Sequence, residues 1–441
     1  MKVLLIQSYL GGAGKGEPPE RAIFPLSLAC LKASLTQQEV VVFDTNIHQV
    51  PFEELRRLLR QFAPDVVGIS IRNIDSTNKS ESVFYYAYIK ETLDVIKSVT
   101  TTARVIAGGA GFSVFARRIM QDEPRIDYGV FLEGEATLPL LLDNLDDPSL
   151  VPNVFYRKDA QVYYSPGGAA PDFATLPLPK RSGMAVERYG EGTVGVETKR
   201  GCHMGCLYCV YGFLNGKKMR LRPVRRVVDD IQSLVEDFGV KRFTFVDSIF
   251  NVPLKHAEDI CNELLRREIA VQWSAWFTEK NLTRQFIDLV VRAGCRNIIF
   301  SPDGFSDNCL RRLGKDITMR DILRAYGIVR GIDGVEVSYN FFKNPPGQSL
   351  DNFIATVAFL IKAKAQMGSR VHFEFNTLRI EPHTRLYEMA LAQGVIKPND
   401  DLLYPAYYSN PTTAYTEKAF NALTGIKDTI NTKVIPLIKG R

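Results

Sequence analysis

The 441-residue sequence has no apolar run that approaches the roughly 18 residues needed to cross a bilayer. Its opening stretch, MKVLLIQSYLGG, is too short for a secretory signal before glycines and charges intervene. Internal repeats and low-complexity tracts are also missing. We therefore expect a cytoplasmic globular protein with no membrane span, and the length predicts two or three domains.

The sequence has only a small excess of positive over negative charge, and it has few cysteines. The net charge is +6 and the pI is near 8.8, which hints at anionic ligands but is not the footprint of a nucleic-acid-binding protein. There are seven cysteines, an odd number. Because disulfides are not expected in a reducing compartment, a tight group of cysteines favours metal binding. Four of them are scattered: Cys30, Cys261, Cys295 and Cys309.

Residues 1–150 alternate short apolar strands with amphipathic helices. This pattern predicts a Rossmann-like or flavodoxin-like domain with a parallel sheet covered on both faces. Its ligand should lie at the carboxyl ends of the strands. The expected strands lie in residues 2–9, 39–46, 64–73, 103–112 and 126–137.

The rest of the chain divides into three further parts. Residues 151–190 contain a predicted hairpin around Lys158 and Asp159 and a Pro- and Gly-rich linker. Residues 191–390 alternate six strands with helices, which predicts an open, partial (β/α)6 barrel with its site at the carboxyl ends of the strands. Residues 391–441 form a C-terminal extension rich in Tyr that could cap this site. The predicted fold class is α/β throughout.

Three cysteines follow the first of these barrel strands, in KRGCHMGCLYC. Structural zinc usually takes four ligands, commonly as two separated pairs, although His203 could complete such a site here. Three thiolates suit a cubane [4Fe-4S] cluster, in which the protein holds three irons and leaves the fourth open. Gly201 and Gly205 would let the loop turn tightly around it. The candidate ligands are Cys202, Cys206 and Cys209.

The CxxxCxxC spacing, with Tyr208 before its last cysteine, resembles the radical S-adenosylmethionine (SAM) superfamily. The resemblance implies that SAM chelates the open iron through its amino and carboxylate groups. It also implies that one electron passes to the sulfonium and yields a 5′-deoxyadenosyl radical. The electron would come from a donor such as flavodoxin or ferredoxin.

Three later segments strengthen the resemblance and imply further SAM contacts. FTFVDSIFN is similar to the second-strand motif of cobalamin-dependent members and implies a role for Asp247. NIIFSPDGFSDNCLRRLGK is similar to their fourth-strand segment, with Asp303 in place of the usual Glu, and LRIEPHTRLYEMALAQGVI implies a role for Arg379. The alternatives stay open: a helix cap or loop hydrogen bond for each aspartate, and an ion pair at the barrel edge for Arg379.

The first domain resembles the cobalamin (B12)-binding domain of the same enzymes. FPLSLACLKASL and FLEGEATLPLLL carry this resemblance. A methylthiotransferase would instead need several cysteines upstream, where only Cys30 is present. We expect residues 1–150 to bind cobalamin by themselves. Glycines would let the backbone approach the nucleotide tail closely, unless they form a plain turn. The candidate cobalamin-binding residues here are Gly108, Gly109, Gly111, Glu133, Gly134 and Glu135.

No DxHxxG motif is present, and Asp44 and His48 have the wrong spacing for one. Cobalamin should therefore bind base-off, without a histidine ligand. GISIRNIDSTN resembles a stretch of tryptophan 2-C-methyltransferase, which implies Arg72 beneath the cobalt, with Asn73 and Asp75 at the same edge. The positive charge of Arg72 would favour transfer of the methyl group as a cation. The alternative role for Arg72 is a surface ion pair. GGAGKGE lacks the GK[ST] ending of a P-loop.

These observations predict a cobalamin-dependent radical SAM enzyme, most simply a methyltransferase acting on a carbon of a small-molecule substrate. Its cofactors would be a [4Fe-4S] cluster, SAM and cobalamin. One alternative is a non-methylating member that closes a ring or rearranges its substrate. Another is a carrier of cobalamin or of the cluster without catalysis, which an open-iron cluster on a SAM-type barrel argues against.

Overall fold

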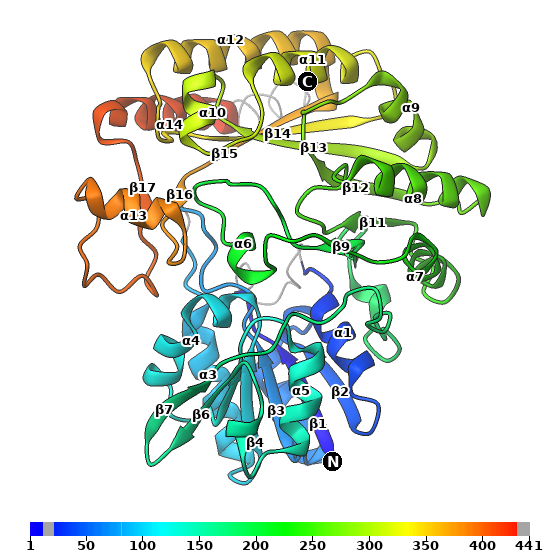
Figure 1. Ribbon diagram of the computed structural model, residues 1–441, viewed down its shortest axis with the longest axis vertical. Helices are drawn as coiled ribbons and strands as arrows, with labels where there is room; N and C mark the ends of the chain where they lie inside the picture. Colours follow the sequence, from blue (N-terminus) through cyan, green and yellow to red (C-terminus); the bar gives the residue numbers. More distant parts are fainter. Residues whose placement is uncertain (12–21, 81, 430–441) are drawn as a thin grey trace, which may run out of the picture.

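The computed structural model describes residues 1–11, 22–80 and 82–429 (Figure 1). The GGAGKGE stretch, apart from its first glycine, lies outside these residues. Two α/β halves lie one above the other, each built on its own sheet, and a thin layer of irregular chain lies between them. This arrangement places the carboxyl ends of the strands of the first sheet toward the second half.

The first half is built on a seven-stranded sheet with the order β2-β1-β3-β4-β5-β6-β7. Its first five strands are parallel, and the Val- and Ile-rich residues of β1, β3 and β4 are buried on both faces, as expected of a sheet between two helical layers. The strands are β1 (Lys2–Gln7), β2 (Glu39–Asp44), β3 (Val66–Ser70), β4 (Arg104–Gly108), β5 (Tyr128–Val130), β6 (Val154–Lys158) and β7 (Gln161–Ser165).

The predicted hairpin forms, but it belongs to this sheet and not to a linker. β6 pairs antiparallel with β5, with Val130 opposite Val154, so the sheet is mixed and not wholly parallel. Phe155 is buried and packs edge-on against Phe112 from the neighbouring helix. The first structural unit therefore runs past residue 150, because an apolar hairpin completes the edge that β5 leaves open.

Five helices cover the two faces of this sheet. α1 and α5 lie side by side on one face and α2 and α3 on the other. The buried residues on the α1 and α5 side continue into the core of the second half as one apolar cluster. The helices are α1 (Leu26–Ser34), α2 (Pro51–Phe62), α3 (Tyr86–Val99), α4 (Ala110–Asp122) and α5 (Gly134–Asp143).

The second half is a six-stranded parallel sheet with the order β15-β14-β13-β12-β11-β8, which confirms the six predicted strands. Alternate residues of each strand are buried against the helices, such as Val337, Tyr339 and Phe341 in β14. The strands are β8 (Gly195–Val196), β11 (Arg242–Phe245), β12 (Gln272–Phe277), β13 (Cys295–Asp303), β14 (Glu336–Phe342) and β15 (Val371–Asn376). The helices are α7 (Val224–Glu236), α8 (Leu254–Arg266), α9 (Arg284–Arg292), α10 (Asp307–Arg312), α11 (Met319–Val329) and α12 (Leu350–Met367).

Short elements occupy the layer between the halves and the C-terminal extension. A ribbon of two strands, β9 and β10, encloses the cysteine segment, and a second ribbon, β16 and β17, follows the last barrel strand. α14 packs on the barrel through Phe420, whose ring stacks on Phe375. These elements are β9 (Lys199–Arg200), α6 (Tyr211–Leu214), β10 (Arg220–Leu221), β16 (Leu378–Arg379), α13 (Arg385–Ala392), β17 (Tyr407–Tyr408) and α14 (Ala414–Thr429).

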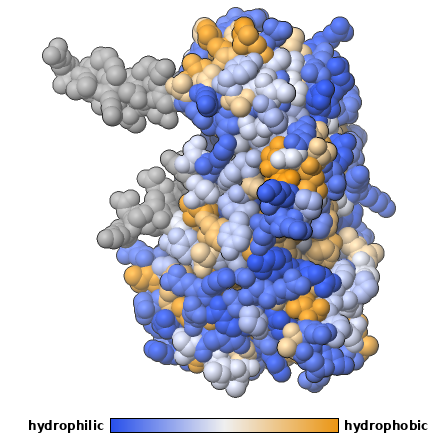
Figure 2. Space-filling view, turned by 90° about the vertical axis from the view of Figure 1, so that its left-hand side faces the viewer, coloured by the Kyte–Doolittle hydropathy of each residue, from blue (hydrophilic) through white to orange (hydrophobic). Residues whose placement is uncertain are grey.

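The surface shows no continuous apolar band on the face seen in Figure 2, where small hydrophobic patches alternate with hydrophilic residues. Across the helices that the structure describes, none combines the length and the apolar character required to cross a bilayer.

Candidate functional site

The three clustered cysteines lie on residues 201–210, here called the cluster loop, which connects β9 to α6. The pKa of Cys209 is raised to about 11, mainly by burial, and the thiols of Cys206 and Cys202 contribute to this rise. Gly201 opens the loop with φ of +92°, and a Cβ there would lie 2.2 Å from the carbonyl oxygen of Lys218. Only glycine fits that position.

Backbone hydrogen bonds fix the cluster loop to three separate segments. Cys202 N–H donates to the carbonyl of Gly216 at 3.0 Å, and Leu207 N–H donates to the carbonyl of Leu313 at 2.8 Å. Leu386 N–H donates in turn to the carbonyl of Leu207 at 2.9 Å. The loop is therefore held in place by its own ribbon, by the end of α10 and by the start of α13.

The donor set of this loop fits an iron–sulfur cluster. No three His, Cys, Asp or Glu side chains in the described ranges converge on one point where a single metal ion could bind. A cubane does not need such convergence, because each of its three protein-bound irons takes its own thiolate. Three neighbouring thiols on one glycine-turned loop meet that requirement, and the ligands would be Cys202, Cys206 and Cys209.

Tyr208, the predicted cofactor-binding aromatic residue of the cysteine motif, and Asp303, a predicted SAM contact, lie together in a partly buried group that also contains Lys315. The Tyr208 hydroxyl donates to the Asp303 carboxylate, and Lys315 forms an ion pair with the same carboxylate. Lys315 also donates to the carbonyl of Ser301 at 2.8 Å. Asp303 has φ of +65°, an uncommon backbone conformation that often marks a functional site. Sequence reasoning missed Lys315, although the LGK ending of the quoted segment contains it; the contact of Asp303 with SAM stays a prediction.

Asp247 is fully buried and fixes the start of the cluster loop. Its carboxylate accepts from the backbone N–H of Thr198 at 2.8 Å, from the Thr198 hydroxyl at 2.6 Å and from the Lys199 ammonium at 2.8 Å. These donors occupy both carboxylate oxygens. Sequence reasoning missed Thr198 and Lys199, because no local pattern connects them with a residue on another strand. A direct contact of Asp247 with SAM remains untested.

Arg379 and Asp75, predicted for different cofactors, form an ion pair with each other. Arg379 Nε donates to Asp75 at 2.6 Å, and its Nη1 donates to Glu381 at 2.6 Å. Burial raises the pKa of Glu381 to about 7, although the Arg379 charge opposes this shift. The barrel-edge ion pair considered as the alternative for Arg379 is therefore present, and it joins the two halves of the protein.

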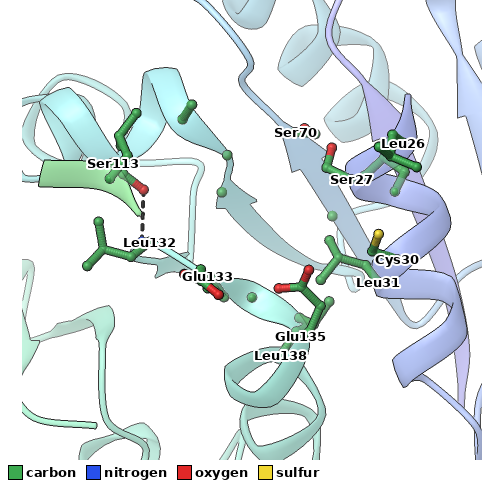
Figure 3. A pocket seen from close by; sticks show the side chains of 18 of the residues that line it. Leu26, Ser27, Cys30, Leu31, Ser70, Ser113, Leu132, Glu133, Glu135 and Leu138 are labelled. Carbon is green, nitrogen blue, oxygen red and sulfur yellow. Dashed lines mark hydrogen bonds between the residues drawn. The ribbon is translucent and has the colours of Figure 1, made fainter. Parts of the chain in front are cut away.

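A cavity of about 290 Å³ lies at the carboxyl ends of β1, β3 and β4, where the parallel sheet predicts a ligand (Figure 3). Gly108 and Gly109, both predicted to approach the nucleotide tail of cobalamin, line it, and that contact stays a prediction. Gly111 does not line it; its N–H donates to the carbonyl of Ile71 at 2.9 Å, so it serves the contact between α4 and the loop after β3. Cys30 is buried and also lies on the cavity wall.

The composition of this cavity suits a flat organic group with polar groups at one end. Its deeper wall is apolar, and three side chains of that wall, Leu26, Leu31 and Leu138, are labelled in Figure 3. Gly134, at the first position of α5, lies against Leu31, where a Cβ would come within 3.0 Å of a methyl group. The residues present therefore fit an aromatic nucleotide tail.

Glu133 and Glu135, also predicted to bind cobalamin, line the cavity but are held by arginines of the second half. Arg200 donates to Glu133 at 2.9 Å and to Glu135 at 2.6 Å, and Arg220 forms an ion pair with Glu133. Burial alone would raise the pKa of Glu135, but the charge and the hydrogen bond of Arg200, together with a backbone hydrogen bond and the charge of Arg222, lower that pKa overall. Sequence reasoning missed both arginines.

Arg72 and Asn73 are exposed on the loop after β3, and Arg72 forms no ion pair with any carboxylate that the structure describes. Burial raises the pKa of Tyr211, two residues after Cys209, and the positive charge of Arg72 opposes this shift. Arg72 therefore faces the cluster side of the first sheet. Its position relative to a cobalt ion stays a prediction.

His48 does not line the cavity and stacks on Phe43 with ring centroids 4.6 Å apart. The Asp44 carboxylate accepts a hydrogen bond from the Tyr189 hydroxyl at 2.6 Å. Both side chains are thus engaged in packing at the edge of the sheet.

Comparison with known proteins identifies both halves. The B12 binding domain family matches residues 19–142, and the Radical SAM superfamily matches residues 196–360. An uncharacterized methyltransferase of Pyrococcus horikoshii is 25% identical over 84% of this chain and 79% of its own length. Cytidylyl-2-hydroxyethylphosphonate methyltransferase of Streptomyces wedmorensis is 24% identical over 78% of this chain and 73% of its own length. The radical SAM methyltransferase TsrM of Kitasatospora setae, solved with cobalamin and a [4Fe-4S] cluster, is similar with a TM-score of 0.74 and 22% identity, over 95% of this chain and 85% of that one.

A B12-binding domain joined to a radical SAM domain with three spaced cysteines defines the chain as a cobalamin-dependent radical SAM enzyme. Its cofactors are cobalamin, a [4Fe-4S] cluster and SAM. It is a distant homologue of tryptophan 2-C-methyltransferase: the Streptomyces laurentii protein is 25% identical over 64% of this chain and 57% of its own length. The relatives are mostly methyltransferases, with some anaerobic magnesium-protoporphyrin IX monomethyl ester cyclases.

Proposed function

We propose that the protein is a methyltransferase that moves a methyl group from SAM, by way of cobalamin, to a carbon of a small-molecule substrate. The observation that carries this proposal is the cavity at the edge of the first sheet, our proposed cobalamin site, whose wall combines residues of that sheet with residues on either side of the cluster loop. A cobalamin site that adjoins the cluster site would suit the transfer of a methyl group that involves both cofactors. The methyltransferases among its relatives, which match most of the chain, support the same reaction.

The residues would divide the work between the two halves. SAM supplies the methyl group and the radical, cobalamin carries the methyl group, and the cluster supplies the electron. Cys202, Cys206 and Cys209 would hold the cluster and leave one iron open for SAM. Arg72, a cation without a carboxylate partner in the part of the chain described, would lie under the cobalt, where it cannot coordinate strongly. The electron would come from a donor such as flavodoxin or ferredoxin, and the substrate would bind between the halves.

One experiment tests the methyl route without knowledge of the substrate. Reconstituted protein is incubated with cobalamin, a strong reductant and SAM labelled in its methyl carbon. We expect the label in protein-bound methylcobalamin, with S-adenosylhomocysteine released in equal amount. If SAM yields only 5′-deoxyadenosine and the cobalamin stays unlabelled, methyl transfer is excluded, and the ring closure of the cyclase relatives becomes the better proposal.

With substrate, the products separate two methylation routes. Radical methylation consumes two SAM molecules and should yield S-adenosylhomocysteine and 5′-deoxyadenosine in near-equal amounts. Transfer of the methyl group as a cation should yield S-adenosylhomocysteine alone, because no hydrogen atom is removed. Labelled carbon in the product is expected in both cases.

A further inference from the structure

The cobalamin cavity is not built by the first half alone. Six of its 27 lining residues come from the second half, and all but one of these six lie in segments that flank the cluster loop in sequence. Arg200 stands two residues before the first cluster cysteine, and Tyr211 stands two residues after the last. The second-half residues that line the cavity are Glu197, Arg200, Tyr211, Leu214, Asn215 and Val246. Residues 1–150 alone lack these six lining residues, and their binding of cobalamin by themselves stays a prediction.

Arg200 lies at the centre of this shared wall and contacts three carboxylates. It donates to Glu133 at 2.9 Å and to Glu135 at 2.6 Å across the boundary between the halves, and to Glu197 at 3.0 Å within its own half. One face of its guanidinium lies over the ring of Phe173, at 4.7 Å from the centroid. Its side chain is only 9% exposed, so these contacts are little screened by water.

Arg200 links the position of the cluster loop to the position of α5. Arg200 lies in β9, whose partner strand β10 ends the same ribbon, and the cluster loop begins directly after it. Glu133 and Glu135 lie at the start of α5, a helix of the first half that also lines the cavity. A planar guanidinium that binds carboxylates on both sides fixes their relative orientation, which a lysine ammonium does not.

We propose that Arg200 is a positioning residue that couples the two cofactor sites, so that an assembled cluster loop tightens cobalamin binding and bound cobalamin stabilises the cluster loop. Such coupling is reciprocal: each site changes the affinity of the other by the same factor. The inference rests on the two cofactors and not on methyl transfer. Its test therefore measures binding, and a failure here is distinct from a failure of the proposed reaction.

The test compares the affinity of the full-length protein for hydroxocobalamin with and without the cluster. The dissociation constant is measured by absorbance titration on cluster-loaded protein and on protein freed of iron by a chelator. In the wild type we expect the cluster to tighten binding about tenfold, within the usual range of coupling between sites. In Arg200→Gln this ratio should fall to near one. A wild-type ratio near one, or an unchanged ratio in Arg200→Gln, would overturn the proposal.

Two further variants separate coupling from loss of stability. Arg125 also binds two carboxylates, of Glu123 and Asp94, but does not line the cavity, so Arg125→Gln should keep the tenfold ratio. Glu135→Gln removes one contact across the boundary and leaves Arg200 paired with two carboxylates. It should fold even if Arg200→Gln does not, and its ratio should fall severalfold; a wild-type ratio in this variant contradicts the proposal.

A spectroscopic readout tests the reverse direction. The electron paramagnetic resonance spectrum is measured with excess reductant, which also reduces the added hydroxocobalamin to cob(II)alamin, and the cobalamin signal is subtracted. The g values of the reduced cluster should then shift when cobalamin is added to the wild type and to Arg125→Gln. They should not shift in Arg200→Gln. A merely structural role for Arg200 would lower stability without removing this response to cobalamin, and that outcome counts against the proposal.

Discussion

Glu279 offers a test of how burial acts on an ionisable group beside the site. It follows β12 directly, is 2% exposed, and its Oε1 atom has no hydrogen-bond partner in the part of the protein that the structure describes. Burial raises its pKa from 4.5 to about 8, although the charge of Lys315 acts in the opposite direction. We predict that Glu279→Gln removes a pH-dependent loss of stability.

The sign follows from proton binding. Between pH 4.5 and about 8 the folded protein keeps a proton on Glu279 that the unfolded chain has lost. The free energy of unfolding therefore falls as the pH rises through this window. Each unit of pKa shift corresponds to about 1.4 kcal/mol, so the loss from this one group reaches about 5 kcal/mol above pH 8. Glutamine cannot ionise, so the variant has no such loss.

The assay is the midpoint of thermal denaturation between pH 5 and pH 8.5. We expect the wild type to lose stability relative to Glu279→Gln as the pH rises, by roughly 10 °C over the range for a domain of this size. Any free-energy cost of burying the glutamine amide is the same at every pH. The difference in slope between the two curves of denaturation midpoint against pH therefore reports the ionisation of Glu279 alone. The matched control is Glu268→Gln, at an exposed position near the end of α8, which should run parallel to the wild type. A parallel curve for Glu279→Gln would refute the reasoning.

Three further predictions concern the site itself. Replacing any one of the cluster cysteines, Cys202, Cys206 or Cys209, with alanine should abolish the binding of about four irons per chain. The control variant Cys261→Ala should retain the iron, and iron analysis measures the difference. Arg72→Ala should still bind hydroxocobalamin but change its absorbance spectrum, and an unchanged spectrum and rate would return Arg72 to a surface role. Arg379→Gln leaves the carboxylates of Asp75 and Glu381 without their cation, at a cost of about 3–5 kcal/mol. The denaturation midpoint should fall, and an unchanged midpoint would show that the ion pair contributes nothing.

The cluster loop could be predicted from the sequence because its information is local. Three thiols within eight positions, separated by glycines, leave few structures open, and the loop follows a strand in both the prediction and the structure. The strands and helices could be predicted for the same reason, because their pattern depends on residues that are close in the sequence. The partner of the hairpin could not be predicted: nothing in residues 154–165 says which sheet edge they complete, and the structure pairs them with β5.

The partners of the charged residues could not be predicted for the same reason. Asp75 and Arg379 are 304 positions apart, and Glu133 and Arg200 are 67 apart. A motif predicts that a charged residue has a role, but the residue that pairs with it depends on how the two halves pack together. Asp75 thus looked like a residue at the cobalamin edge, and its carboxylate instead accepts from an arginine of the barrel extension.

The charged contacts between the halves have a consequence for the distance between the two cofactors. Arg200 joins the start of the cluster loop to the first half, and Arg379 joins the strand after the barrel to the loop that follows β3. Arg385 donates to the carbonyl of Gly205 in the middle of the cluster loop. These are charge-assisted contacts of fixed geometry, whereas the stretch at 166–170 is exposed on the surface. We therefore expect the docking of the two halves, and not the length of the chain that connects them, to set the separation of cobalamin and cluster.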